Sequence, residues 1–253
     1  MSTLGALFQG ERIKWRRSWA TVAAILPPLC QVAFLLLIFW FSEIQADALG
    51  PGFQVWYQVN SAAWNIIFMP ITVALVALLS WDQEESAGAW KHLLIQPVPR
   101  YAHYLAKLLS HSALLLIAQI VLTGALILSS ELLRKHASYL TMGHQRLDLA
   151  FKLGWYSLLG TMPLVGFHTW LSTRMRGVGL ALTTTLVGSL LTVLLMVKVP
   201  QARWLPWSLA SQGVRLSLDG ARSSWLLLLA GLILTGLFMG LGTFDFSRRE
   251  EQR

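Results

Sequence analysis

His103, Lys107 and His111 recur at intervals of four residues, so a helix would place all three on one face. Two imidazoles in such a row could bind a metal ion. The lysine between them is positively charged, however, and it would repel a metal cation. We therefore predict no metal site and no catalytic residue in this row.

Two glutamates, Glu84 and Glu85, precede the row and resemble the start of the motif in CAAX-processing intramembrane proteases. That motif requires an arginine four residues after the second glutamate. Here Glu85 is followed by Ser86-Ala87-Gly88-Ala89, and the later Phe and His motifs are not in order. An intramembrane protease is the enzymatic alternative, but the residues favour a protein that is not itself an enzyme.

The same acidic residues open a segment that predicts a short amphipathic helix over residues 84–96. Acidic side chains favour a helix N-terminus, and Pro97 and Pro99 end the helix. Helical periodicity separates an apolar face from a polar face. The apolar face consists of Ala87, Trp90, Leu93 and Leu94, and the polar face of Lys91, His92 and Gln96. Such a helix lies across a membrane surface, where it could also serve only to anchor its loop.

Long apolar runs flank this segment and predict an all-α membrane protein. Hydrophobic residues make up 55% of the chain and charged residues only 13%, about half the usual share in soluble domains. A helix needs roughly 20 apolar residues to cross a bilayer. Six runs meet this length, so residues 1–253 are expected to form a single transmembrane domain. The runs cover residues 19–41, 61–81, 112–130, 151–172, 178–197 and 225–243.

Basic residues are distributed unevenly between these runs. Twelve of the 20 Lys and Arg residues lie in the N-terminal flank, the second and fourth loops and the C-terminal tail, whereas residues 42–60 contain none. Because basic loops favour the cytoplasmic side, both termini and the predicted surface helix are expected to be cytoplasmic. The net charge of +8 then reflects topology and lipid headgroup contacts, and not nucleic acid binding.

A longer motif runs through the surface helix into the next span. It comprises Glu84, Glu85, Gly88, Trp90, Lys91, His92, Leu93, Leu94, Pro97, Arg100 and Tyr104-Leu105-Ala106-Lys107. This motif resembles the coupling helix of permease subunits in type-2 ABC exporters. The Trp-Lys-His-Leu-Leu run is most similar to the branch associated with lantibiotic immunity and bacitracin resistance. One departure is Gln96-Pro97-Val98, where the family usually has Leu-Pro-Val.

The resemblance implies a dimer of permease subunits, identical or paralogous, with two cytoplasmic ABC ATPase subunits docked on the coupling helices. Arg174 and Arg176 in the short fourth loop could add a second contact, although a plain basic turn explains them equally well. ATP and Mg would be bound by the partner ATPase, because no Lys here follows a Gly, as a nucleotide-binding loop requires. No cofactor is expected in this chain. An amphiphilic peptide or antibiotic is the substrate that the resemblance implies.

A membrane scaffold or immunity protein that sequesters a peptide without energy is the remaining alternative. It would need no helix for docking an ATPase. Co-purification of an ATP-binding subunit distinguishes it from a transporter.

The N-terminal residues 4–19 combine leading apolar side chains with a run of basic ones, which predicts an interfacial helix. In the family that it resembles, such a helix leads into the first span and lies beside the coupling helix.

Polar residues inside the expected spans need a structural or functional reason. Gln31, Asn65, Gln119 and Thr184 could line a translocation path or could fix helix packing through hydrogen bonds. The fifth loop, residues 198–224, mixes Trp, Pro and apolar residues. That composition favours a segment that dips into the outer interface, like the re-entrant element of type-2 exporters.

Overall fold

The computed structural model describes residues 3–41, 52–88, 98–136, 146–174, 177–218 and 224–248 of the 253-residue chain. Every regular element in these ranges is helical, which confirms the predicted all-α fold. The elements are α1 (Thr3–Trp15), α2 (Trp19–Phe41), α3 (Gly52–Ala63), the π-helical turn η2 (Trp64–Phe68), α4 (Met69–Ser86), α6 (Arg100–His136), α7 (Leu147–Ser172), α8 (Val178–Lys198), the 3₁₀ turn η3 (Pro200–Trp204), α9 (Pro206–Leu218) and α10 (Ser224–Arg248).

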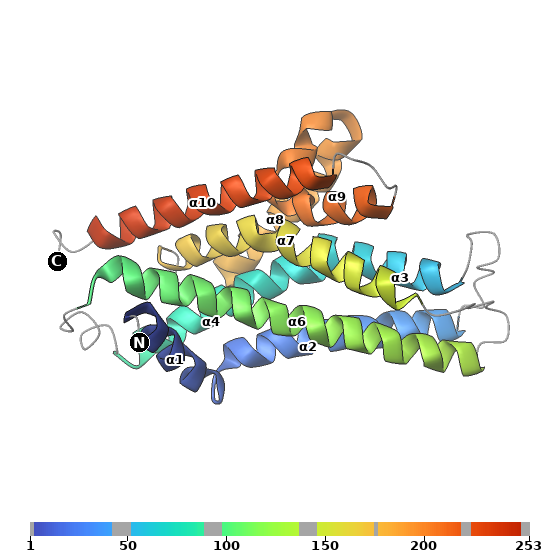
Figure 1. Ribbon diagram of the computed structural model, residues 1–253, viewed down its shortest axis with the longest axis horizontal. Coiled ribbons are helices and arrows are strands. Elements are labelled where there is room, and N and C mark those ends of the chain that lie inside the picture. The colour runs from blue at the N-terminus through green and yellow to red at the C-terminus, as the bar shows by residue number, and fades with distance from the viewer. Residues whose placement is uncertain are drawn as a thin grey trace.

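The long helices lie side by side in one elongated bundle, with α1 and the C-terminal end of α10 at the same end (Figure 1). Within the described residues, five helical segments are long and apolar enough to cross a membrane. They are Trp19–Phe41, Gly52–Ser86, Arg100–Lys135, Val178–Lys198 and Trp225–Arg248. The chain is therefore a multi-pass membrane protein.

The remaining expected span, residues 151–172, corresponds to α7, which is long enough at 26 residues but less apolar. Its position explains this difference, because α7 packs against α4, α6, α9 and α10. Fifteen of its residues are buried. A helix that is covered by protein meets little lipid, so polar side chains on it can bond to neighbouring helices.

All of the other helices except α2 extend beyond the apolar runs that predicted them. Residues 19–41 coincide with α2, and residues 178–197 and 225–243 lie within α8 and α10. The run at residues 61–81, by contrast, is the middle of a continuous helical segment from Gly52 to Ser86, and α6 is much longer than residues 112–130. Hydropathy marks the part of a helix that suits hydrocarbon, whereas backbone hydrogen bonding continues through polar residues at both ends.

The π-helical turn η2 interrupts the helix between α3 and α4. Trp64 and Asn65 are buried within it. A π turn adds a residue to one helical turn and so rotates the side chains that follow, and such turns often occur at functional sites. No pattern in the sequence predicted this turn.

The segment after α8 folds back along the bundle, where α9 packs against α7, α8 and α10. Entry of this segment into the outer membrane interface stays a prediction. The Trp207 ring lies against Gly188, where an added Cβ would come within 2.4 Å of it. Gly188 is ten residues before the last residue of α8, so this contact lies about 15 Å from that end of the helix. A Cβ on Gly160 of α7 would lie 2.5 Å from the Ala210 Cα, so glycine is required where α9 packs on α7.

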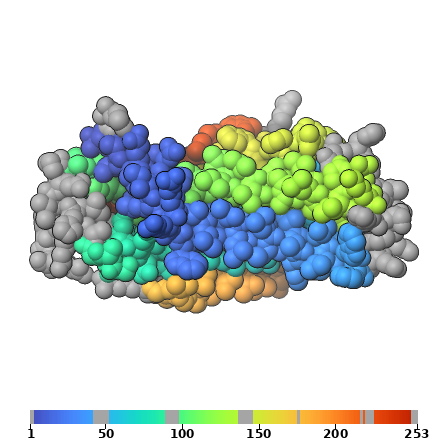
Figure 2. Space-filling model, turned by 90° about the horizontal axis from the view of Figure 1, so that it is seen from below, coloured from blue at the N-terminus to red at the C-terminus, as the bar shows by residue number. Residues whose placement is uncertain are grey.

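The short helix α1 lies on the surface of the bundle, against α6 (Figure 2). It is joined to α2 by the turn that contains Arg16 and Arg17. One acidic side chain of α1, Glu11, is turned inward and buried. Contact of α1 with the membrane interface stays a prediction.

Candidate functional site

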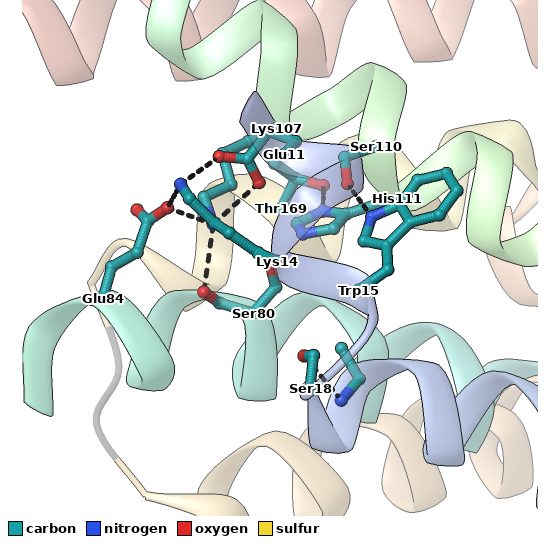
Figure 3. A network of polar contacts seen from close by, with 11 residues as sticks. Glu11, Lys14, Trp15, Ser18, Ser80, Glu84, Lys107, Ser110, His111 and Thr169 are labelled. Atoms are coloured by element: carbon teal, nitrogen blue, oxygen red, sulfur yellow. Dashed lines mark hydrogen bonds and ion pairs between the residues drawn. The ribbon is translucent and has the colours of Figure 1, made fainter. Parts of the chain in front are cut away.

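Four charged side chains from three helices meet at the end of the bundle where α1 lies (Figure 3). Glu11 and Lys14 come from α1, Glu84 from the last turn of α4 and Lys107 from the beginning of α6. The Lys107 ammonium lies 2.8 Å from Glu84 Oε1 and 3.1 Å from Glu11 Oε2. Lys14 lies 2.5 Å from Glu11 Oε1 and also pairs with Glu84 Oε1. We call these four residues the charge cluster.

The charge cluster is electrically balanced, and three of its members are buried, whereas the Lys14 side chain is 35% exposed. Glu84 and Lys107 are each 3% exposed and Glu11 is 7% exposed. Two carboxylates face two ammonium groups, which is the arrangement in which buried charges are tolerated. Lys107 also donates hydrogen bonds to Ser80 O at 3.0 Å and Ser80 Oγ at 2.9 Å. All N–H donors of this lysine are therefore satisfied inside the protein.

The two members of the charge cluster on α1 are held in their ionised forms. Burial raises the pKa of the Glu11 carboxyl, but Lys107 and Lys14 outweigh this effect and keep the pKa below its ordinary value of 4.5. Burial lowers the pKa of Lys14, but Glu84 and Glu11 outweigh it and keep that pKa above its ordinary value of 10.5. Ion pairs therefore hold α1 on the bundle at neutral pH.

Two further contacts extend this network along α6 (Figure 3). Trp15 Nε1 donates a hydrogen bond to Ser110 Oγ at 2.9 Å. The His111 Nδ1 and Thr169 Oγ1 atoms, on α6 and α7, also lie 2.9 Å apart. The network thus joins α1, α4, α6 and α7, so a movement of α1 would act on three long helices together.

The structure corrects the expected position of the acidic residues. The sequence predicts Glu84 and Glu85 at the start of a separate helix over residues 84–96, but they lie in the last turn of α4, which ends at Ser86. Gly88 follows with a φ of +62°, a conformation that glycine adopts readily after a helix C-terminus. Glu84 points inward because Lys14 and Lys107 neutralise its charge there.

The expected partner-binding residues therefore divide into groups. Glu84 and Lys107 are internal, whereas Glu85 and Gly88 are exposed and Arg100 is partly exposed. Contact of these residues with a partner stays a prediction. Seven of the expected residues lie outside the part of the chain that the structure describes. These are Trp90, Lys91, His92, Leu93, Leu94, Pro97 and Arg176.

Arg174, in the turn between α7 and α8, is exposed and bonds to the end of α10. Its Nη2 lies 2.5 Å from Asp245 Oδ1 and its Nε lies 3.0 Å from Oδ2. The guanidinium also lies 5.1 Å from the Trp170 ring centroid. This fork-shaped pair ties the short fourth loop to the C-terminal helix at the same end of the bundle as α1.

Three of the four expected translocation residues are buried and bonded between helices. Gln31 Nε2 donates to Asn60 O at 2.9 Å, and Gln119 Oε1 accepts from Trp64 Nε1 at 3.1 Å. These bonds fix the packing of α2 and α6 on the α3–η2 segment. A role of either glutamine in a translocation path stays a prediction.

Asn65 has both a packing contact and a place beside open space. Its Oδ1 accepts a hydrogen bond from Ser157 Oγ at 2.6 Å, and its side chain lines a cavity between helices. Thr184, by contrast, is partly exposed and donates to Leu180 O in its own helix at 2.9 Å. The four residues therefore do not line one common surface.

Two further buried residues belong to neither expected set of site residues. Thr185, next to the expected Thr184, is fully buried, with its Oγ1 3.1 Å from His168 Nε2 of α7. The signal was present, since Ala181, Thr185 and Ser189 recur at helical spacing along α8. Glu11 was masked by the basic residues around it, and nothing local in the sequence predicts that it turns inward.

The chain matches the model of a known protein family. The family described as ABC-2 family transporter protein matches residues 7–192, which include the whole charge cluster and most of α8. No curated protein matches the chain.

Proposed function

The chain belongs to the ABC-2 family of transporter proteins, and we propose that it is the membrane permease subunit of an ATP-driven exporter. The subunit would couple ATP hydrolysis by a separate ABC ATPase to the movement of an amphiphilic peptide or antibiotic. Family membership favours this function over the two alternatives, an intramembrane protease and an energy-independent scaffold.

The charge cluster is the observation that carries the coupling role. The segment that follows α4 is where the family resemblance expects the ATPase to dock, and Glu84 at the end of α4 is bonded to Lys14 and Lys107. A force applied to this segment would meet a stiff junction of α1, α4 and α6. Such a junction transmits a displacement to the spans, whereas a loose loop would absorb it.

The arrangement of partners follows from the same proposal. Two permease subunits, identical or paralogous, would form the membrane part in the cell membrane. Two ATPase subunits, which bind ATP and Mg, would dock on the cytoplasmic face. Their contacts on this chain would include Glu85, Arg100 and Arg174.

Co-purification of an ATP-binding subunit from native membranes tests the proposal. We expect Trp90→Ala to reduce the amount of ATPase that is recovered, because Trp90 is a large apolar residue in the segment after α4, where the resemblance expects the ATPase to dock. Gln96→Ala, a polar residue of the same segment, is the matched control and should have little effect. Recovery of the intact permease with no ATP-binding partner would favour the scaffold alternative.

Glu85→Lys is the more informative of the two charge reversals at the end of α4. Glu85 is exposed, so its reversal should weaken ATPase docking or transport and leave the fold intact. Reversal of Glu84 would disrupt the charge cluster itself. Normal assembly and normal transport in Glu85→Lys would exclude this residue from the interface.

Cysteine labelling tests the proposed orientation, with both termini cytoplasmic. After replacement of Cys30, which is exposed, single cysteines are placed at Gln54 and Arg249. A membrane-impermeant maleimide should label Gln54→Cys from outside the cell and Arg249→Cys only after permeabilisation. Labelling of both from the same side would overturn the proposed topology.

A further inference from the structure

A cavity of about 360 Å³ lies between the α3–η2 segment, α8 and α9. This volume falls within the range of sites that bind small molecules. The cavity shares no residue with the charge cluster, and the packing interactions described so far give it no role. Its wall includes the π-helical turn, a distortion that often marks a binding site.

The lining of the cavity carries one charged residue, Arg215 near the C-terminal end of α9. Every other lining residue is uncharged, so no carboxylate on the wall balances this guanidinium. Arg215 is exposed, and it forms no ion pair with another residue in the described ranges. The cavity is therefore suited to an anionic group and disfavours a cationic one.

Two buried polar atoms in the lining have no hydrogen-bond partner among the described residues. They are Ser189 Oγ and Trp207 Nε1. Ser189 is only 8% exposed, so its hydroxyl is not exchanging freely with bulk solvent. Buried polar groups are nearly always bonded, so two unbonded polar atoms in one wall are unusual.

Apolar side chains complete the wall. Val193 and Met196 of α8 and Leu218 of α9 line the same space as the polar groups. A wholly polar ligand would leave these groups without contacts, and methionine adapts well to varied apolar shapes. The occupant is therefore expected to have an apolar portion as well as an anionic one.

The order of these groups along α9 sets the orientation of the occupant. Trp207 packs on Gly188 of α8, whereas Arg215 is eight residues further along α9 and about 12 Å away along its axis. The exposed Arg215 thus lies at the rim, whereas the buried Ser189 hydroxyl lies further in.

We propose that this cavity binds an anionic amphiphile, a molecule with a phosphate or carboxylate group that pairs with Arg215 and an apolar portion that contacts Val193 and Met196. Its link to transport rests on the proposed function, because the bound molecule would then be a substrate or a lipid that moves with one. Binding itself needs only this chain, so it can be measured where no ATPase is present.

Protection of a cysteine inside the cavity measures binding. Ser211 lines the cavity and is partly buried, so Ser211→Cys in a Cys30→Ser background gives one reporter thiol. The full-length protein in neutral detergent is labelled with a maleimide in the presence of dodecyl phosphate, dodecyltrimethylammonium or inorganic phosphate. Dodecyl phosphate should slow labelling about tenfold or more at saturation, and the other two should not.

Substitution at the rim tests the role of the charge. Arg215→Gln should weaken the apparent affinity for dodecyl phosphate by about tenfold or more, since a charge-assisted hydrogen bond is lost, and Arg215→Lys should retain most of it. Arg203→Gln is the matched control, because Arg203 lies over the Trp204 ring at 5.7 Å and does not line the cavity.

The proposal is overturned if dodecyltrimethylammonium protects the cysteine as well as dodecyl phosphate does. It is also overturned if inorganic phosphate protects the cysteine, or if none of the three probes does. Nanodiscs distinguish the source of the occupant. Protection in phosphatidylglycerol but not in phosphatidylcholine identifies a membrane lipid, whereas protection by dodecyl phosphate in both identifies a separate anionic amphiphile. Both results support the proposal.

Discussion

Lys107 is the residue whose loss should damage the charge cluster most. Its ammonium contacts Glu84, Glu11 and Ser80 within 3.1 Å, and it is 3% exposed. In Lys107→Met, two buried carboxylates would share only Lys14. Breaking a buried ion pair in this way costs about 3–5 kcal/mol. At roughly 2–4 °C per kcal/mol for a chain of this size, the apparent melting temperature should fall by about 10 °C.

The apparent melting temperature in neutral detergent measures this loss, and limited trypsin digestion locates it. Cleavage at Arg16 and Arg17, between α1 and α2, should become faster if α1 leaves the bundle. Arg134→Met is the matched control, because Arg134 pairs with Glu131 and their side chains are 53% and 37% exposed. Exposed pairs contribute about 1 kcal/mol or less, so this variant should shift the melting temperature by only a few degrees.

A second substitution distinguishes the effect of an unbalanced charge from the effect of a changed side-chain volume. Lys107→Met combined with Glu84→Gln removes one charge of each sign and leaves the Glu11–Lys14 pair, so the double variant should recover about half of the lost stability or more. The reasoning is refuted if Lys107→Met is no more destabilising than Arg134→Met. An equal loss in the single and double variants would show that packing, and not charge, controls the site.

The pKa shifts in the charge cluster predict a plateau of stability. Because the pKa of Glu11 is lowered, this residue contributes to folding stability above pH 4.5, and the contribution is lost as the pH falls through the shifted pKa. Because the pKa of Lys14 is raised, this residue contributes to folding stability below pH 10.5, and the contribution is lost as the pH rises through the shifted pKa. Melting temperatures from pH 3 to 11 should therefore fall at both ends, less steeply on the acid side in Glu11→Gln and on the alkaline side in Lys14→Met. Gly160→Ala should displace α9 and lower stability by about 1–3 kcal/mol, whereas Gly124→Ala, with no atom within 4 Å of the added Cβ, should be neutral by the same melting assay. Thr185→Val should cost about 1–3 kcal/mol by the same assay, because it removes the bonding partner of a buried imidazole on α7, and Thr185→Ser should not.

The all-α membrane fold follows from the sequence alone. Apolar runs of about 20 residues have the length of spanning helices, in which every backbone N–H and C=O is bonded within the segment, and they are about twice as long as a spanning strand. The resemblance around residues 84–107 led to the permease class in the same way, and the ABC-2 family match supports it. Both conclusions depend on features that are local in the chain.

The position of α7 shows where hydropathy stops being informative. Its polar residues, including His168, lower its hydropathy, yet they face α8 and other protein neighbours and not lipid. Hydropathy is summed over all sides of a helix, so it cannot distinguish polar groups that meet protein from polar groups that meet lipid.

The charge cluster and the cavity depend on tertiary structure, and the sequence alone does not predict them. Glu84 is separated from Lys14 by 70 positions, and no local pattern distinguishes it from its exposed neighbour Glu85. Whether a carboxylate is buried depends on which cations other helices bring to it, because an unpaired charge would not be stable there. The cavity likewise arises where a π-helical turn, α8 and α9 do not fill the space between them. Packing between distant segments sets both features, and helical periodicity along one segment carries no information about its partner.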